Sequence, residues 1–80
     1  MERQRYGYCR KCKRQILLTL QKNGRGWLEC EPYIGRFVES YEPDAAEFIT
    51  PDGTVKHGQK VWMDQDGELG YRGHECVEVR

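Results

Sequence analysis

Hydrophobic and polar positions alternate along much of this chain, and alternation with a period of two predicts β-strands. Residues 15–20 place three aliphatic side chains on one face of such a strand. The segment Asn23-Gly24-Arg25-Gly26 is a hairpin signal, and residues 27–30 are the predicted return strand. A short helix over residues 14–22 is the alternative. We favour the strand because the apolar run is short and a glycine-rich turn follows it.

The rest of the chain continues this pattern after a proline. We predict that Pro32 breaks the chain after the return strand. Residues 33–41 alternate, but both faces carry apolar side chains, so the buried face is left open. Further strands are predicted at 47–50, 54–56 and 59–63, and turns at 51–53 and 64–67. His57 lies among polar residues and is predicted to be a solvated turn residue.

Two short clusters near the ends of the chain have the composition of a metal site. Cys9-Arg10-Lys11-Cys12 is a C-x-x-C pair, and His74-Glu75-Cys76 adds an imidazole and a thiol. Structural zinc takes four such ligands in a tetrahedral arrangement. A redox C-x-x-C pair normally precedes a helix in a βαβ unit, which this sequence does not indicate. We therefore predict a Zn²⁺ site that joins the two ends of the chain.

The identity of the four ligands has one alternative. The predicted set is Cys9, Cys12, His74 and Cys76. Cys30 lies on a predicted strand and is either an alternate ligand or a buried small hydrophobic residue. Both an all-cysteine site and a site with Cys30 in place of Cys76 stay open.

The length and composition of the chain support a metal-stabilised β domain. Its 80 residues are 38% hydrophobic and 32% charged, so we expect one domain, residues 1–80, with a thin core. A metal that joins Cys12 to His74 closes a loop of about 60 residues, which restricts the unfolded chain by roughly 3.5 kcal/mol. The predicted fold class is mostly β, a small zinc-ribbon-like antiparallel β domain with the metal joining the N- and C-terminal segments.

The formal net charge is zero, but the charges are unevenly distributed. Residues 1–14 carry six basic groups and one acid, whereas residues 29–52 carry seven acids and one arginine. The basic segment suits contact with nucleic acid. The interpretation that we favour is that its cations offset the charge of the thiolates.

Several functional classes lack their sequence signals. No phosphate-binding loop and no dinucleotide-binding motif are present, and four protein ligands would leave no open position on a catalytic zinc. We therefore predict a protein that is not an enzyme. No apolar run has the length of a signal-peptide core or a membrane span. We predict a cytoplasmic location, where closely spaced cysteines indicate a metal rather than disulfides.

Four short motifs occur in a recognisable order. They are Cys9 with Cys12, Gly26-Trp27 followed by Cys30, Thr50-Pro51-Asp52-Gly53-Thr54-Val55, and Gly70-Tyr71-Arg72-Gly73-His74 closed by Cys76. Together they resemble small zinc-ribbon-like proteins of unknown function from phages and mobile elements of Gram-positive bacteria. The resemblance implies the predicted fold and ligands, and a host cytoplasmic location, but no known activity. Only Glu75 separates His74 from Cys76, whereas the pattern has more residues between these two ligands. This difference keeps Cys30 as an alternate ligand.

The predicted function is that of a protein-interaction module. The acidic middle segment combines carboxylates with aromatic anchors, a composition that suits a basic protein partner. Its predicted contact residues are Tyr33, Phe37, Glu39, Tyr41, Glu42, Asp44 and Glu47. In a phage, the sharper hypothesis is an inhibitor of a host defence nuclease, similar in action to an anti-CRISPR protein. The alternative is a nucleic-acid-binding zinc ribbon that uses the basic N-terminal segment, with weaker binding expected.

Overall fold

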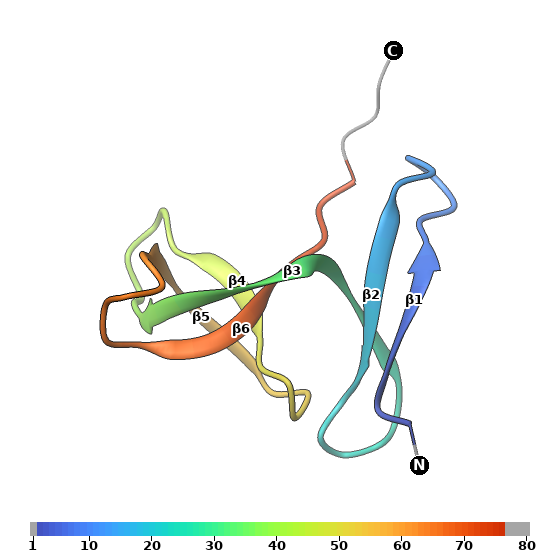
Figure 1. Ribbon diagram of the computed structural model, residues 1–80, viewed down its shortest axis with the longest axis horizontal. Helices are drawn as coiled ribbons and strands as arrows, with labels where there is room; N and C mark the ends of the chain where they lie inside the picture. Colours follow the sequence, from blue (N-terminus) through green and yellow to red (C-terminus); the bar gives the residue numbers. More distant parts are fainter. Residues whose placement is uncertain (1, 77–80) are drawn as a thin grey trace.

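The computed structural model describes residues 2–76, which form six β-strands in one antiparallel sheet (Figure 1). The strands are β1 (Gln4–Tyr8), β2 (Gln15–Leu20), β3 (Trp27–Glu39), β4 (Ala46–Ile49), β5 (Val55–Val61) and β6 (Glu68–Gly73). The predicted antiparallel β fold class is therefore confirmed, and the helical alternative for residues 14–22 is wrong. Within residues 2–76, no helix is long and apolar enough to cross a membrane.

The long strand β3 joins two parts of the sheet. Its first residues pair with β2, and β2 pairs with β1. Its last residues pair with β5 on one side and with β6 on the other. Because β4 pairs with both β5 and β6, strands β3, β5, β4 and β6 close into a ring. Figure 1 shows this ring beside the β1–β2 hairpin, with β3 passing from one to the other.

Pro32 does not end a strand, so the predicted break is wrong. Strand β3 continues through it, but the pairing of β3 with β6 shifts register between Cys30 and Ile34. Proline has no N–H to donate to a ladder, and it is tolerated in a strand where the ladder is interrupted. The proline therefore marks a local irregularity where β3 leaves the hairpin and enters the ring.

The centre of the ring is filled by two stacked aromatic rings. The ring centroids of Phe37 and Phe48 lie 4.5 Å apart, with 7° between the ring planes. Two glycines provide the space for Phe37, because a Cβ at Gly70 would lie 2.7 Å from its Cε1 and one at Gly58 would lie 2.8 Å from its Cδ2. Phe37 is 0% exposed. Its predicted role in partner binding is therefore wrong.

A second group of buried side chains packs between the hairpin and the ring. Leu17, Cys30 and Ile49 form this cluster, and Leu28 and Tyr71 pack against it. Since Ile16 and Leu20 are also buried, both faces of β2 are covered. The alternating pattern of β2 correctly predicted a strand, but not that its second face would be buried as well.

The predicted turn at residues 51–53 is confirmed, and it docks against the β2–β3 connection. Lys22 N donates to Gly53 O at 3.1 Å. Gly53 has φ 88°, and a Cβ there would lie 2.0 Å from Leu20 O. A glycine is required here both by the left-handed backbone and by the close approach of the two chains. This contact fixes the ring of strands against the hairpin, at the end of the molecule opposite the β1–β2 turn that contains Cys9 and Cys12 (Figure 1).

Candidate metal centre

The side chains of Cys9, Cys12, His74 and Cys76 converge on one point. Their ligand atoms all lie within 4.8 Å of one another, with Cys9 Sγ 3.6 Å from Cys76 Sγ and Cys12 Sγ 3.5 Å from His74 Nε2. In a tetrahedral site with bonds of about 2.3 Å to sulfur and about 2.05 Å to nitrogen, these two separations would be about 3.8 and about 3.6 Å. Both separations are close to those of such a site, and the cluster is compact enough to hold one metal ion.

The first ligand pair is held by a tight turn between β1 and β2. Lys13 N donates to Cys9 O and Cys9 N donates to Arg14 O, both at 2.9 Å. Lys13 has φ 63°, an uncommon left-handed conformation for a residue other than glycine. The turn reverses the chain directly after Cys12, which allows both thiols to point to the same side.

The second ligand pair is positioned by the ladder between β6 and β3. Cys30 pairs with Gly73, and His74 N then donates to Glu29 O at 3.0 Å. The His74 side chain is 1% exposed, and its Nδ1 lies 3.3 Å from Glu31 Oε1. A carboxylate on one ring nitrogen fixes the tautomer and directs the other nitrogen to the metal. Glu31 is thus part of the site, although no spacing signal in the sequence points to it.

Two thiols of the cluster, Cys9 and Cys76, differ in acidity. Backbone hydrogen bonds from Cys12 and Lys11 lower the pKa of Cys9 to about 6. Burial, followed by hydrogen bonds to Cys9 and Cys12, raises the pKa of Cys76 to about 11. Burial alone would lower the pKa of His74. Hydrogen bonds to Cys9, Glu31 and Cys12 have the larger combined effect, and the pKa of His74 is raised overall. Three thiolates in this space need a nearby positive charge, and a bound cation would supply it.

Cys30 and His57 lie apart from the cluster. Cys30 is fully buried between β2 and β6, where its thiol donates to Thr19 Oγ1 at 3.7 Å. Burial is the main cause that raises the pKa of this thiol. His57 is exposed on β5 and pairs with Glu47 of β4, so its predicted place in a turn is wrong.

The predicted partner-binding residues do not form one surface. Glu39, Tyr41, Glu42 and Asp44 lie together at the end of β3 and in the loop that follows. Glu47 instead lines a cavity of about 130 Å³ with His74, whereas Tyr33 lines another with Glu31 and Arg72. With Phe37 buried, four of the seven predicted residues remain as a continuous stretch.

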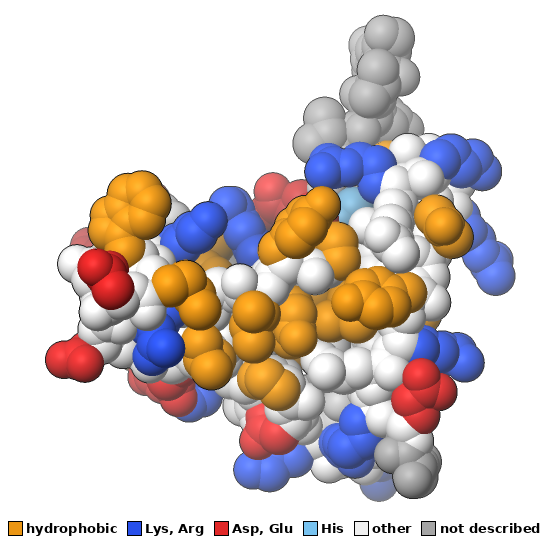
Figure 2. Space-filling view, in the orientation of Figure 1, with side chains coloured by type: hydrophobic (Ala, Val, Ile, Leu, Met, Phe, Trp, Pro, Cys, Tyr) orange, Lys and Arg blue, Asp and Glu red, His pale blue; other side chains and the backbone are white. Residues whose placement is uncertain are grey.

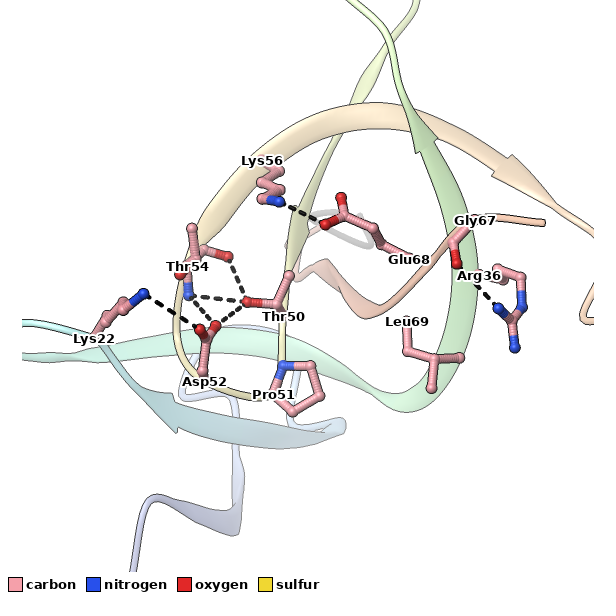
Figure 3. A pocket seen from close by; sticks show the side chains of 10 residues that line it. All are labelled: Lys22, Arg36, Thr50, Pro51, Asp52, Thr54, Lys56, Gly67, Glu68 and Leu69. Carbon is pink, nitrogen blue, oxygen red and sulfur yellow. Dashed lines mark hydrogen bonds and ion pairs between the residues drawn. The ribbon is translucent and has the colours of Figure 1, made fainter.

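A larger depression, of about 660 Å³, lies beside the turn at residues 50–54 (Figure 3). Four of its charged groups form two ion pairs: Lys56 Nζ lies 2.6 Å from Glu68 Oε1, and Lys22 Nζ lies 3.7 Å from Asp52 Oδ2. The remaining cation, Arg36, donates to Gly67 O at 3.0 Å. Thr50 donates to Asp52, which lowers the pKa of that carboxyl group. These groups stabilise the turn, and the metal cluster does not line this depression.

Glu31→Gln is expected to weaken metal binding by about 10- to 100-fold, because the carboxylate that orients His74 is lost. The fold should persist, since the Glu31 side chain is partly exposed and an amide still accepts a hydrogen bond. Competition with a chromophoric chelator measures the affinity. Glu75→Gln is the matched control, because Glu75 follows His74 in the sequence but its side chain is exposed. Equal affinities for Glu31→Gln and the unmodified chain would contradict this role.

The motifs that resemble phage proteins take clear places in this structure. Two of them supply the four clustered residues, and a third forms the turn at residues 51–53. The resemblance itself stays a prediction. Comparisons of the chain with protein-family models, with curated proteins and with solved structures find no match.

Proposed function

We propose that the protein is a non-enzymatic zinc-binding protein in which the ion has a structural role. The observation that carries this proposal is the convergence of three thiols and one imidazole within 4.8 Å. Thiolate and imidazole ligands in a tetrahedral arrangement favour zinc over magnesium, calcium or manganese, which prefer oxygen ligands. Four ligands from the chain would complete the coordination, so that no position stays open for a reacting water.

Cobalt substitution tests the proposed donor set. Cobalt(II) added to metal-free protein is expected to give the intense visible absorption of a tetrahedral thiolate site, because cobalt readily replaces zinc in such sites. Cys76→Ser should weaken the sulfur-to-metal charge-transfer band, whereas Cys30→Ala should leave it unchanged. A weak, octahedral spectrum from the unmodified chain would contradict the proposal.

We further propose that the zinc-stabilised fold presents a protein-binding surface at its acidic end, defined by Glu39, Tyr41, Glu42 and Asp44. Tyr41 is 85% exposed, and its hydroxyl donates to Glu39 Oε2 at 3.5 Å. An exposed aromatic ring among carboxylates suits an interface with a basic protein. A nuclease whose basic groove normally binds phosphate is the class of partner that the predicted phage setting favours.

Reversing the charge of the acidic end tests this surface. The triple variant Glu39→Lys, Glu42→Lys and Asp44→Lys is expected to lose a basic partner that the zinc-loaded chain captures from host lysate, with zinc content unchanged. The matched control is Asp64→Lys with Asp66→Lys, which reverses exposed acids in the β5–β6 turn. Capture of the same partner by the triple variant would show that the acidic end is not the contact surface.

A further inference from the structure

The strand β1 carries two exposed aromatic side chains on one face. Tyr6 is 65% exposed and Tyr8 is 72% exposed. Two residues apart on a strand, they point to the same side, about 7 Å from each other along the chain. Neither hydroxyl has a hydrogen-bond partner among residues 2–76. These side chains are not used by the metal site or by the acidic end.

The hairpin holds this pair of tyrosines in place. Tyr6 is opposite Leu17 and Tyr8 is opposite Gln15 in the β1–β2 ladder. Arg5 points to the other face, where its guanidinium carbon lies 4.8 Å from the centre of the Trp27 ring. The backbone beneath the two tyrosines is therefore ordered by pairing and by packing on the opposite face.

A group of exposed cations continues from this strand. Arg10, Lys11, Lys13 and Arg14 are all exposed on the turn that contains the first ligand pair. None of them has an ion pair within the part of the chain that the structure describes. Figure 2 shows Lys and Arg side chains gathered along the edge of the molecule formed by β1 and this turn.

We propose that this tyrosine and cation surface, defined by Tyr6, Tyr8, Arg10, Lys11, Lys13 and Arg14, binds single-stranded nucleic acid. Exposed aromatic rings stack on unpaired bases, and adjacent cations neutralise the phosphates. Bases within a duplex are already stacked on one another and do not offer their faces to a side chain. Since every base has a π-face, binding is expected to tolerate any sequence.

The proposed nucleic-acid surface is a feature additional to the proposed structural zinc. It rests on that zinc only because the ion would hold the shape of the turn that contains Cys9 and Cys12. The surface also places nucleic acid at the opposite part of the sheet from the acidic end. The two surfaces carry opposite charge, so a ligand that suits one is repelled by the other.

Fluorescence anisotropy with labelled oligo(dT) and oligo(U) tests the inference on the zinc-loaded chain. At 50 mM salt we expect dissociation constants of about 1 to 100 µM. Four phosphate contacts give a logarithmic salt slope of about −2.8, so affinity should fall about 50-fold at 200 mM salt. The double variant Lys11→Gln with Arg14→Gln should reduce that slope to about −1.4. No anisotropy change at about 1 mM chain would overturn the inference.

Matched tyrosine variants separate stacking from charge. Tyr6→Ala with Tyr8→Ala is expected to weaken binding at least about tenfold while the salt slope and the zinc content stay unchanged. Tyr6→Phe with Tyr8→Phe should bind normally, because the ring face is retained. Tyr33→Ala with Tyr41→Ala, which removes two tyrosines elsewhere that are even more exposed, is the control and should bind oligonucleotide normally. Normal oligonucleotide binding by Tyr6→Ala with Tyr8→Ala would overturn the inference. It would also be overturned if the unmodified chain bound no oligonucleotide and this double variant instead lost a protein partner.

Discussion

Chelation of the metal is expected to unfold the protein. The four clustered residues join β1 and β2 to the segment after β6, and a metal between Cys12 and His74 restricts the unfolded chain by roughly 3.5 kcal/mol through loop closure alone. A core of this size supplies only about 3–5 kcal/mol. Circular dichroism and urea denaturation before and after chelation measure the loss, and re-addition of zinc should restore the folded state.

Single ligand variants identify which residues carry this effect. His74→Ala should bind zinc much more weakly and unfold as the chelated protein does, whereas His57→Ala should do neither. Cys30→Ala should keep zinc, because its thiol packs in the core away from the cluster. It should still lower the free energy of unfolding by about 1 kcal/mol through lost packing. Release of zinc by Cys30→Ala together with retention by His74→Ala would require an all-cysteine site.

Phe37→Ala is expected to lower the free energy of unfolding of the zinc-loaded protein by about 3–5 kcal/mol. The ring is fully buried, stacks on Phe48 and fills the space left by two glycines. Removal of the phenyl group would leave a cavity at the centre of the closed ring formed by β3, β5, β4 and β6. The urea midpoint measures the change, which is comparable with the whole stability of such a small domain.

Two further variants make this prediction specific. Gly70→Ala places a methyl group 2.7 Å from the Phe37 ring and should cost about 1–3 kcal/mol by overpacking. Tyr41→Ala removes an exposed ring and should change stability by less than about 0.5 kcal/mol. An unchanged midpoint for Phe37→Ala would contradict the packing described for the ring of strands.

The sequence predicted the elements whose signals are local. Residues 15–20 alternate over a full strand, and Pro51-Asp52-Gly53 has the composition of a turn, so both were predicted correctly. The ligand pairs were predicted because each is closely spaced, so its grouping does not depend on the tertiary fold. Their convergence was predicted from ligand chemistry alone. The pairing of β6 with β3 that produces this convergence was not predicted, because no single segment encodes it.

Two of the failures, at Phe37 and Glu31, have a common physical cause. Both faces of residues 33–41 carry apolar side chains, and only the closure of the ring of strands against Gly58 and Gly70 decides that Phe37 is buried. Glu31 reaches His74 because the ladder of β3 and β6 brings together residues far apart in the sequence. Long-range pairing of this kind has no periodic signature. The strand β1 was missed because its basic composition was interpreted as a charged segment beside the thiolates.

The metal content of the purified chain tests the central claim most directly. Protein prepared without chelator and analysed by mass spectrometry is predicted to contain one zinc per chain. The double variant Cys9→Ser with Cys12→Ser, prepared in the same way, is predicted to contain none. Absence of stoichiometric metal from the unmodified chain, or full zinc content in the double variant, would contradict the assignment of Cys9, Cys12, His74 and Cys76 as the zinc site.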